Sequence, residues 1–226
     1  MSDYYSANLS AHRLKRVYEI ASPRIRQYLN AEVDYAIGRI RPDDAVLELG
    51  CGYGRILARL TKRGNPVYGI DTSMESLILA QDELYRHPNL YLARMDASHL
   101  GFADGSFDMV LCLQNGISAF HCDAGRLIWE SLRVTRPGGM VLYSTYSEKF
   151  WSERLAWFQA QAAEGLLGEI DLLKTRDGTI VCKDGFTATT MSPDQFSALV
   201  TDHGESAEIT EVDESALFCE IRRTRV

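Results

Sequence analysis

Three acidic residues and a glycine-rich turn occupy positions from which they could hold a nucleotide-type cofactor. Glu48 lies inside the apolar run that precedes the turn Gly50-Cys51-Gly52-Tyr53-Gly54, and Asp71 and Asp96 follow two later apolar runs. Glycine has no Cβ, so this turn lets the backbone approach a ligand closely. A strand, such a turn and a helix N-terminus together form a cradle for a nucleotide cofactor, and a downstream carboxylate can bind its ribose.

The elements that must position these residues alternate along the chain. The pattern predicts strands at 45–49, 66–70, 90–93, 107–113 and 140–145, with helices at 53–62, 73–86 and 124–134. Short apolar strands that alternate with helices are typical of a parallel sheet covered on both faces. We therefore expect a doubly wound α/β fold in which the acids meet at the carboxyl edge of the strands.

The two ends of the chain lie outside this alternation. Two helices are predicted near the N-terminus, and the second begins at Ser22-Pro23, because serine caps helices and proline favours the first helical position. A further helix and a hairpin around Asp177-Gly178 follow the fifth strand. We expect a single domain over residues 1–226, with a helical cap at 1–40, a cofactor-binding core at 45–145, a substrate cover at 147–190 and a final helix and strands at 192–226.

Length and charge limit the classes of partner. The chain has 226 residues, of which 46% are hydrophobic, and its formal net charge is −7. A chain of this length can bury a sizeable core in one domain. Because a negative protein repels phosphate backbones, we expect no nucleic-acid partner.

Cysteine spacing and hydropathy limit the location of the protein. No two of the five cysteines form a C-x-x-C pair, so we expect neither a metal site nor a disulfide framework. No apolar run approaches the roughly 18 residues that suggest a membrane span. The N-terminus also lacks the basic and apolar regions of a secretory leader. These features predict a cytoplasmic protein that does not bind membranes, and nothing in the sequence specifies an oligomeric state.

The spacing of the glycines separates two kinds of cofactor. The dinucleotide fingerprint is G-x-G-x-x-G, but Arg55 stands where its last glycine would be. Asp71 ends the second strand, where an acid can accept hydrogen bonds from both ribose hydroxyls. Asp96 follows the third strand and could accept a hydrogen bond from an adenine amine. Either acid could instead be a helix cap.

Taken together, these motifs resemble those of the class I S-adenosylmethionine-dependent methyltransferases. Residues 46–54 are similar to the first motif of the family, Asp71 to its ribose-binding acid and Asp96-Ala97 to its adenine-contacting motif. Residues 102–110 resemble the segment that enters its fourth strand, and residues 133–139 resemble the turn before its fifth. The segments occur in the order that the family has.

The resemblance implies a seven-stranded sheet whose last strand is antiparallel, with residues 207–212 and 217–222 as its final two strands. It also implies S-adenosylmethionine as the cofactor and S-adenosylhomocysteine as its product. Glu48 would anchor the methionyl amino end, and the glycine turn would pass beneath the cofactor. The complete set of expected cofactor contacts is Glu48, Gly50, Cys51, Gly52, Gly54, Asp71, Thr72, Met74, Asp96, Ala97, Leu113, Gln114 and Asn115.

The activity that the resemblance implies is methyl transfer by in-line displacement, in which the protein aligns the acceptor and excludes water. A hydroxyl acceptor would need a general base, and His121 is the candidate. Tyr18 and Tyr146 are expected to touch the acceptor. The sequence lacks both the Pro-Pro-aromatic motif of nucleic-acid amino-methylating members and a Pro-Cys nucleophile. These absences favour a small-molecule acceptor.

Three alternatives stay open at this point. A methyltransferase acting on a protein or RNA would share the cofactor-binding core. A catalytically silent protein could bind S-adenosylmethionine without turnover. A nicotinamide oxidoreductase is disfavoured by the glycine spacing and by the lack of a separate substrate domain. The aromatic residues at both ends could also serve only as helix-packing core.

Overall fold

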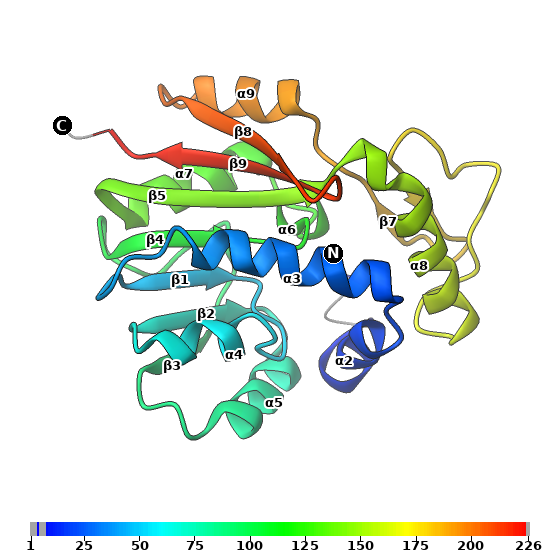
Figure 1. Cartoon of the computed structure of the whole chain (residues 1–226), viewed down its shortest axis with the longest axis horizontal. Coiled ribbons are helices and arrows are strands. Elements are labelled where there is room, and N and C mark those ends of the chain that lie inside the picture. The colour runs from blue at the N-terminus through cyan, green and yellow to red at the C-terminus, as the bar shows by residue number, and fades with distance from the viewer. Residues whose placement is uncertain (1–3, 5–7, 225–226) are drawn as a thin grey trace.

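The central sheet brings the predicted strands together in a mixed arrangement (Figure 1). A computed structural model describes residue 4 and residues 8–224; parts of the predicted segments 1–40 and 192–226 therefore lie outside the described residues. The strand order is β3-β2-β1-β4-β5-β9-β8, and β9 pairs antiparallel with both β5 and β8. The strands are β1 (Val46–Leu49), β2 (Val67–Asp71), β3 (Leu90–Arg94), β4 (Phe107–Cys112), β5 (Thr135–Tyr146), β8 (Ala207–Val212) and β9 (Ala216–Arg222). The prediction of a doubly wound α/β fold with an antiparallel last strand is confirmed.

Helices cover both faces of this sheet (Figure 1). They are α2 (Ala11–Glu19), α3 (Pro23–Ile37), α4 (Leu57–Leu60), α5 (Met74–Leu84), α6 (Gly116–Ala119), α7 (Ala124–Val134), α8 (Trp151–Ala163) and α9 (Pro193–Thr201). Short 3₁₀ turns follow α4 and precede α8. The side chains of α3 and α4 belong to one core, and those of α7 and α9 belong to a second core on the opposite face. No helix among the described residues is long and apolar enough to cross a bilayer.

Alternation along the strands supplies both cores. Met109 and Leu111 of β4 point into the core beneath α3, whereas Val110 and Cys112 point into the core beneath α7. All four side chains are buried. A strand that is buried on both faces reads as a continuous apolar run, which is why these segments stood out in the sequence.

Local capping signals fix where several elements begin. The Ser22 hydroxyl accepts a hydrogen bond from the Ile25 amide at 3.2 Å, and proline follows at the first position of α3. Ser192 and Gln195 form a reciprocal capping box at the start of α9. Asp177 and Gly178 both have positive φ, as a two-residue hairpin turn requires. These three predictions of turns and helix starts are confirmed.

Two predicted boundaries are wrong. The helix expected over residues 53–62 begins only at Leu57, because Gly52 and Gly54 have φ of 53° and 87°, which a right-handed helix does not allow. The turn expected before the fifth strand is part of β5. There Thr135 pairs with Phe107 across a register shift, and the Gly138 amide donates to the Arg223 carbonyl.

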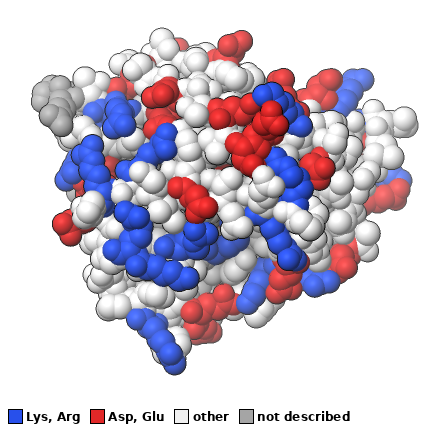
Figure 2. Space-filling view, in the orientation of Figure 1, with Lys and Arg blue, Asp and Glu red and all other residues white. Residues whose placement is uncertain are grey.

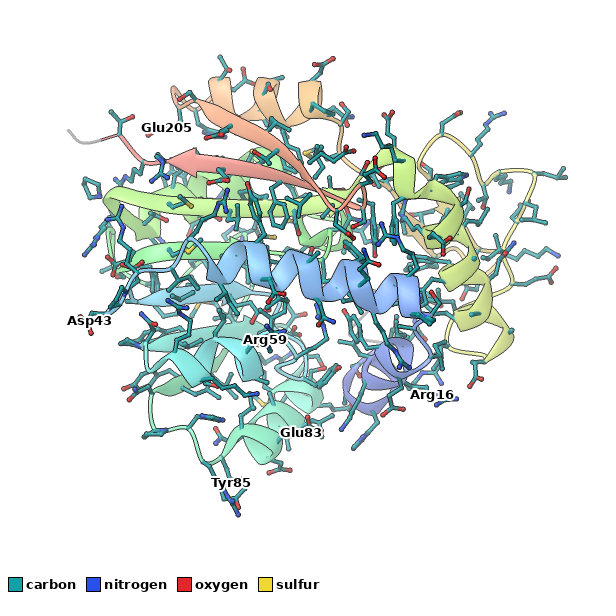
Figure 3. All side chains as sticks on the ribbon, viewed as in Figure 1. Arg16, Asp43, Arg59, Glu83, Tyr85 and Glu205 are labelled. Atoms are coloured by element: carbon teal, nitrogen blue, oxygen red, sulfur yellow. The ribbon has the colours of Figure 1, made fainter. Side chains whose placement is uncertain are left out.

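The N-terminal helix α2 lies at the carboxyl edge of the sheet together with α8 (Figure 1). Lys15 of α2 forms an ion pair with Glu83 of α5 at 2.5 Å. Arg16 pairs with Glu164, just past the end of α8, at 2.9 Å. Figure 3 shows Arg16 and Glu83 on their two helices beside this edge. The helix is therefore held between α5 and the segment that follows β5, which also carries the hairpin β6 (Ile180–Val181) and β7 (Thr187–Ala188).

Candidate active site

A cavity of about 630 Å³ opens at the carboxyl edge of the sheet. Small-molecule sites are typically about 300–1,000 Å³, so this cavity is of the size of a ligand site. Its wall combines the ends of β1 to β5 with α2, α8 and the loop after β6. The sequence-predicted residues in the wall are Tyr18, Gly50, Gly52, Asp71, Thr72, Asp96, Ala97, Leu113, Gln114, His121 and Tyr146.

The glycine turn after β1 forms the floor of this cavity. Gly50 has φ of 68°, and a Cβ placed on it would lie 2.5 Å from the ring of Phe120. Gly54 lies outside the cavity wall, and a Cβ there would meet the side chain of Leu84 on α5 at 2.8 Å. Gly50 therefore permits the Phe120 ring to pack closely against the turn, whereas Gly54 permits close packing of the turn against α5.

Asp71 connects the glycine turn to the next helix. Its Oδ2 accepts from the Gly52 amide at 2.8 Å, and its Oδ1 accepts from the Ser73 amide at 2.8 Å. The N-cap of α5 is Ser73, whose hydroxyl accepts from the Ser76 amide. Asp71 is therefore not the N-cap residue, and it presents a carboxylate at the cavity wall.

Asp96 lies in a turn after β3, and no helix follows it directly. Its Oδ1 accepts from the Ser98 amide at 2.8 Å and from the Ser98 hydroxyl at 2.7 Å. Burial alone would raise the pKa of Asp96, but these hydrogen bonds outweigh it and lower the pKa below its ordinary value. The carboxylate is therefore ionised at neutral pH and can accept a hydrogen bond from a ligand.

Glu48 and Arg55 line a small recess of about 40 Å³ beside the cavity. Glu48 is 2% exposed, and burial raises its pKa to about 8, with the nearby Arg55 charge acting against that rise. Among the described residues, neither Glu48 Oε2 nor Arg55 Nη2 has a hydrogen-bond partner. A carboxyl oxygen and a guanidinium nitrogen, both buried, thus have unused hydrogen-bonding capacity beside the recess. Such groups are costly unless a ligand satisfies them.

Arg55 is a site residue that sequence reasoning missed. The sequence marked this position only as a missing glycine. Its guanidinium lies 4.7 Å from the ring centroid of Tyr18, and Nη2 lies 4.0 Å from Glu32 Oε2. Glu32 belongs to α3, so no local spacing could reveal this arrangement.

Besides Glu48 and Gly54, three further expected cofactor contacts, Cys51, Met74 and Asn115, lie outside the cavity wall. Asn115 accepts from the Thr145 hydroxyl at 2.7 Å and donates to the Thr189 carbonyl at 2.8 Å, so its side chain ties two segments together. Met74 is 49% exposed at the start of α5. Cys51 lines only the small recess, and burial raises the pKa of its thiol well above the ordinary range.

The three residues expected near the acceptor all line the cavity. Burial raises the pKa of both Tyr18 and Tyr146, so each hydroxyl keeps its proton at neutral pH. The Tyr146 ring lies 5.2 Å from that of Tyr28. His121 has φ of 50° and stands in the exposed loop between α6 and α7.

The cover contributes further wall residues; the sequence offered Trp157 and Phe158 as cover aromatics with core packing as the alternative, but it did not offer Val17, Gln161 or Phe186. Val17 comes from α2, and Trp157, Phe158 and Gln161 come from α8. Phe186 follows β6. Aromatic residues on these segments were visible in the sequence, but helical spacing alone did not distinguish a cavity wall from ordinary core.

The fold and this edge of the sheet are those of a doubly wound α/β domain, and comparison with known proteins shows which proteins the chain resembles. Residues 46–139 match the family described as methyltransferase domain. A phthiotriol/phenolphthiotriol dimycocerosates methyltransferase of Mycobacterium ulcerans is 38% identical over 103 residues, which are 44% of this chain and 36% of that protein. A malonyl-[acyl-carrier protein] O-methyltransferase of Erwinia pyrifoliae is 34% identical over 166 residues, which are 70% of this chain and 61% of that protein.

A solved structure shares the fold over nearly the whole chain. Magnesium protoporphyrin IX methyltransferase from Synechocystis, crystallised with S-adenosylhomocysteine, superposes with a TM-score of 0.64 at 20% identity and covers 98% of this chain and 97% of its own. The matches to the two curated relatives span less than two thirds of either protein. Residues 46–139 are thus similar to a methyltransferase domain, and the curated relatives that match this chain are methyltransferases. The neighbouring structure holds S-adenosylhomocysteine, the product that S-adenosylmethionine leaves after methyl transfer.

The site residues fit this cofactor chemically. Its methionyl end carries an ammonium and a carboxylate. The recess offers the Glu48 carboxyl and the Arg55 guanidinium, each with one atom that has no hydrogen-bond partner among the described residues. Its adenosine end carries hydroxyl and amine donors, and Asp71 and Asp96 offer carboxylates at the cavity wall.

Proposed function

We propose that this protein transfers a methyl group from S-adenosylmethionine to a small-molecule acceptor. The observation that carries the proposal is a single cavity with polar groups suited to the cofactor at one end and aromatic side chains at the other. Asp71 and Asp96 would hold the adenosine part, whereas Glu48 and Arg55 would hold the zwitterionic end. Leu113 and Gln114 lie at the end of β4, between the two regions.

When bound, the cofactor supplies an activated methyl group on a sulfonium. The residues of this chain align the acceptor and exclude water, which is the main requirement of an in-line displacement. Tyr18 and Tyr146 keep their protons at neutral pH and so act as hydrogen-bond donors rather than bases. His121 is the proposed base for an acceptor that must lose a proton during transfer.

Residues 1–40 and 147–190 form the proposed cover of the acceptor. Several observations favour a small molecule over RNA. Figure 2 shows basic and acidic side chains interspersed on the face that carries α3. The formal net charge is −7. The relatives are named for dimycocerosates, malonyl-[acyl-carrier protein] and magnesium protoporphyrin IX.

Calorimetry with S-adenosylmethionine and S-adenosylhomocysteine tests the cofactor part of the proposal. We expect both to bind, and we expect Asp71→Ala to weaken binding by about tenfold or more, because a charge-assisted hydrogen bond contributes about 1.5–3 kcal/mol. Labelled cofactor incubated with a metabolite extract, and in parallel with protein and tRNA, tests the acceptor part. Absence of binding, or label only in protein or tRNA, would overturn the proposal.

A further inference from the structure

The side-chain amide of Gln114 is held in one orientation by groups from α3. Its Nε2 donates to Glu32 Oε2 at 2.8 Å and to Tyr28 Oη at 2.9 Å. Glu32 is fully buried and also accepts from the Gln114 backbone amide at 2.9 Å and from the Ser144 hydroxyl at 2.5 Å. A carboxylate accepts hydrogen bonds and donates none, so the NH₂ group of Gln114, rather than its carbonyl, must face Glu32. Both amide hydrogens are therefore engaged.

The carbonyl oxygen of the same side chain remains available to a ligand. Gln114 lines the cavity. No group among the described residues donates to Gln114 Oε1, and this atom is not among the buried polar atoms that lack a partner. It therefore faces open space. A carbonyl oxygen can only accept, so the group that meets it must carry an N–H or O–H.

A second amide lines the acceptor end of the cavity without a partner. Gln161 of α8 is 3% exposed. Its side-chain amide makes no hydrogen bond with any group in the described part of the chain. The amide atoms are also not fully enclosed by protein, so a ligand can reach them. Buried amides are normally paired, so this one is available to a polar edge of a ligand.

The walls between these amides are apolar and consist largely of aromatic rings. The ring centroids of Tyr18 and Trp157 are 6.0 Å apart, those of Trp157 and Phe158 are 6.3 Å apart, and those of Phe158 and Phe186 are 6.1 Å apart. The Trp157 indole N–H donates to the Val17 carbonyl at 3.1 Å, so it is engaged within the protein. Aromatic rings at varied inclinations can contact both the face and the edges of an aromatic ligand, since aromatic pairs prefer offset or edge-to-face arrangements.

The charges around this end disfavour ionised acceptors. The Asp and Arg side chains in the described wall are Asp71, Arg94 and Asp96, and all three belong to the ends of β2 and β3. An anionic acceptor would therefore lack a counter-ion at the aromatic end. A cationic acceptor is disfavoured as well. A cation at the aromatic end would have no carboxylate partner there, because the carboxylates in the described wall, Asp71 and Asp96, lie at the end of β2 and just after β3.

We infer that the methyl acceptor is an uncharged aromatic or heteroaromatic compound whose nucleophilic O–H or N–H donates to Gln114 Oε1. A second polar group on its ring system pairs with the Gln161 amide. In the transfer, a lone pair of that oxygen or nitrogen forms the bond to the methyl carbon as the methyl–sulfur bond breaks and its electron pair stays on sulfur. The proton of the acceptor leaves to solvent or to a base. This inference rests on the proposed function.

The test identifies the methylated product without choosing a substrate beforehand. Small-molecule extract is separated into neutral, acidic and basic fractions, each is incubated with the protein and methyl-labelled cofactor, and products are resolved by mass. We expect label on a neutral aromatic compound. Label confined to the acidic or basic fraction, or to an aliphatic compound, overturns the inference and leaves the proposed function standing. No label in any fraction contradicts the proposed function itself.

Variants of Gln161 and Gln114 test the proposed contacts of the two amides with the methyl acceptor. Gln161→Met removes an unpartnered amide, so we expect an unchanged or higher Tm and an unchanged cofactor Kd, with the acceptor KM raised about three- to tenfold. Gln159→Met, at an exposed position on the same helix, is the matched control and should change none of these. An unchanged KM for Gln161→Met would contradict its role.

Gln114→Met tests which ligand meets the carbonyl oxygen. We expect kcat/KM for the acceptor to fall at least tenfold while the cofactor Kd stays within about twofold. A larger change in cofactor Kd than in acceptor KM would place the cofactor's ammonium at Gln114 Oε1 and overturn the donor assignment. The Tm of this variant is expected to fall, because Glu32 loses a buried donor, so the comparison uses temperatures at which the variant is folded.

Discussion

At the scale of the residue, Glu48 shows how a single buried carboxyl can link folding to ligand binding. A buried carboxylate is costly unless it is paired, and the neighbouring residues of an apolar strand offer no partner. A glutamate inside such a strand therefore indicates a functional role. Burial and the neighbouring charges give it a pKa of about 8. Arg55 lines the same recess, so the residue that departs from the glycine pattern brings a guanidinium beside the Glu48 carboxyl.

Glu48 predicts a specific dependence of stability on pH. Between its ordinary pKa of 4.5 and its folded-state pKa of about 8, the unfolded chain has lost this proton while the folded chain keeps it. The unfolded state then binds fewer protons, so the contribution of Glu48 to the free energy of unfolding falls by about 1.4 kcal/mol per pH unit as pH rises. It is fully present below pH 4.5 and is lost as pH approaches 8.

Denaturant titrations of the cofactor-free protein from pH 5 to 8 check this prediction. Glu48→Gln should remove that slope and be more stable than the wild type at pH 8. Glu153→Gln, an exposed carboxyl on α8, should follow the wild-type curve. Parallel curves for Glu48→Gln and wild type would show that Glu48 does not titrate in this way.

At the scale of the element, the glycine turn decides where α4 begins and how closely it sits to α5. The positive φ values delay the helix to Leu57, and Gly54 brings the turn against Leu84 and Ala80. A sequence pattern identifies the glycines but not their separate tasks. Gly50 lines the cavity, whereas Gly54 allows the turn to pack against α5.

Alanine substitutions separate the steric role of Gly54 from its backbone role. Gly54→Ala combines a left-handed φ of 87° with a clash against Leu84, so we expect the free energy of unfolding to fall by about 2–5 kcal/mol. Gly64 has a similar φ of 83° and nothing within 4 Å of an added Cβ. Gly64→Ala should cost only about 1–2 kcal/mol. Equal losses in chemical denaturation would mean that packing against α5 contributes nothing.

At the scale of the whole molecule, the cavity depends on segments far apart in the chain. The Glu32 carboxylate of α3 holds Gln114 after β4, and Trp157 of α8 holds the backbone of α2 at Val17. In the described part of the chain, helices outside residues 46–139 therefore connect the polar end of the cavity to its aromatic end. Ligand binding should accordingly stabilise the entire fold.

Thermal unfolding with ligand checks that expectation. At a cofactor concentration about 100 times Kd, binding adds about 2.7 kcal/mol to stability. For a chain of this size that corresponds to a rise in Tm of about 5–10 °C. S-adenosylhomocysteine should act similarly, and a nicotinamide dinucleotide should have no effect. A shift with the dinucleotide and none with S-adenosylmethionine would favour the oxidoreductase alternative.

The sequence by itself determined the sheet, its carboxyl edge and the kind of cofactor. Those features depend on short-range signals: apolar runs of strand length, glycines where φ must be positive, and acids at strand ends that topology brings to one edge. The predicted boundaries were wrong at residues 53–56, where the glycine turn delays the start of α4, and at Thr135, where β5 begins earlier than expected.

Only the tertiary structure decided the acceptor side. The contacts that define it join Gln114 to Glu32, 82 positions apart, and Trp157 to Val17, 140 positions apart. Sequence periodicity does not reveal that Gln161 of α8 points inward without a hydrogen-bond partner among the described residues. It also does not reveal that the carbonyl oxygen of Gln114, rather than its NH₂ group, is available to a ligand. Those outcomes follow from how α2, α3 and α8 pack together. The glycine turn thus identifies the methyl donor, and the packing of helices outside it shapes the site for the acceptor.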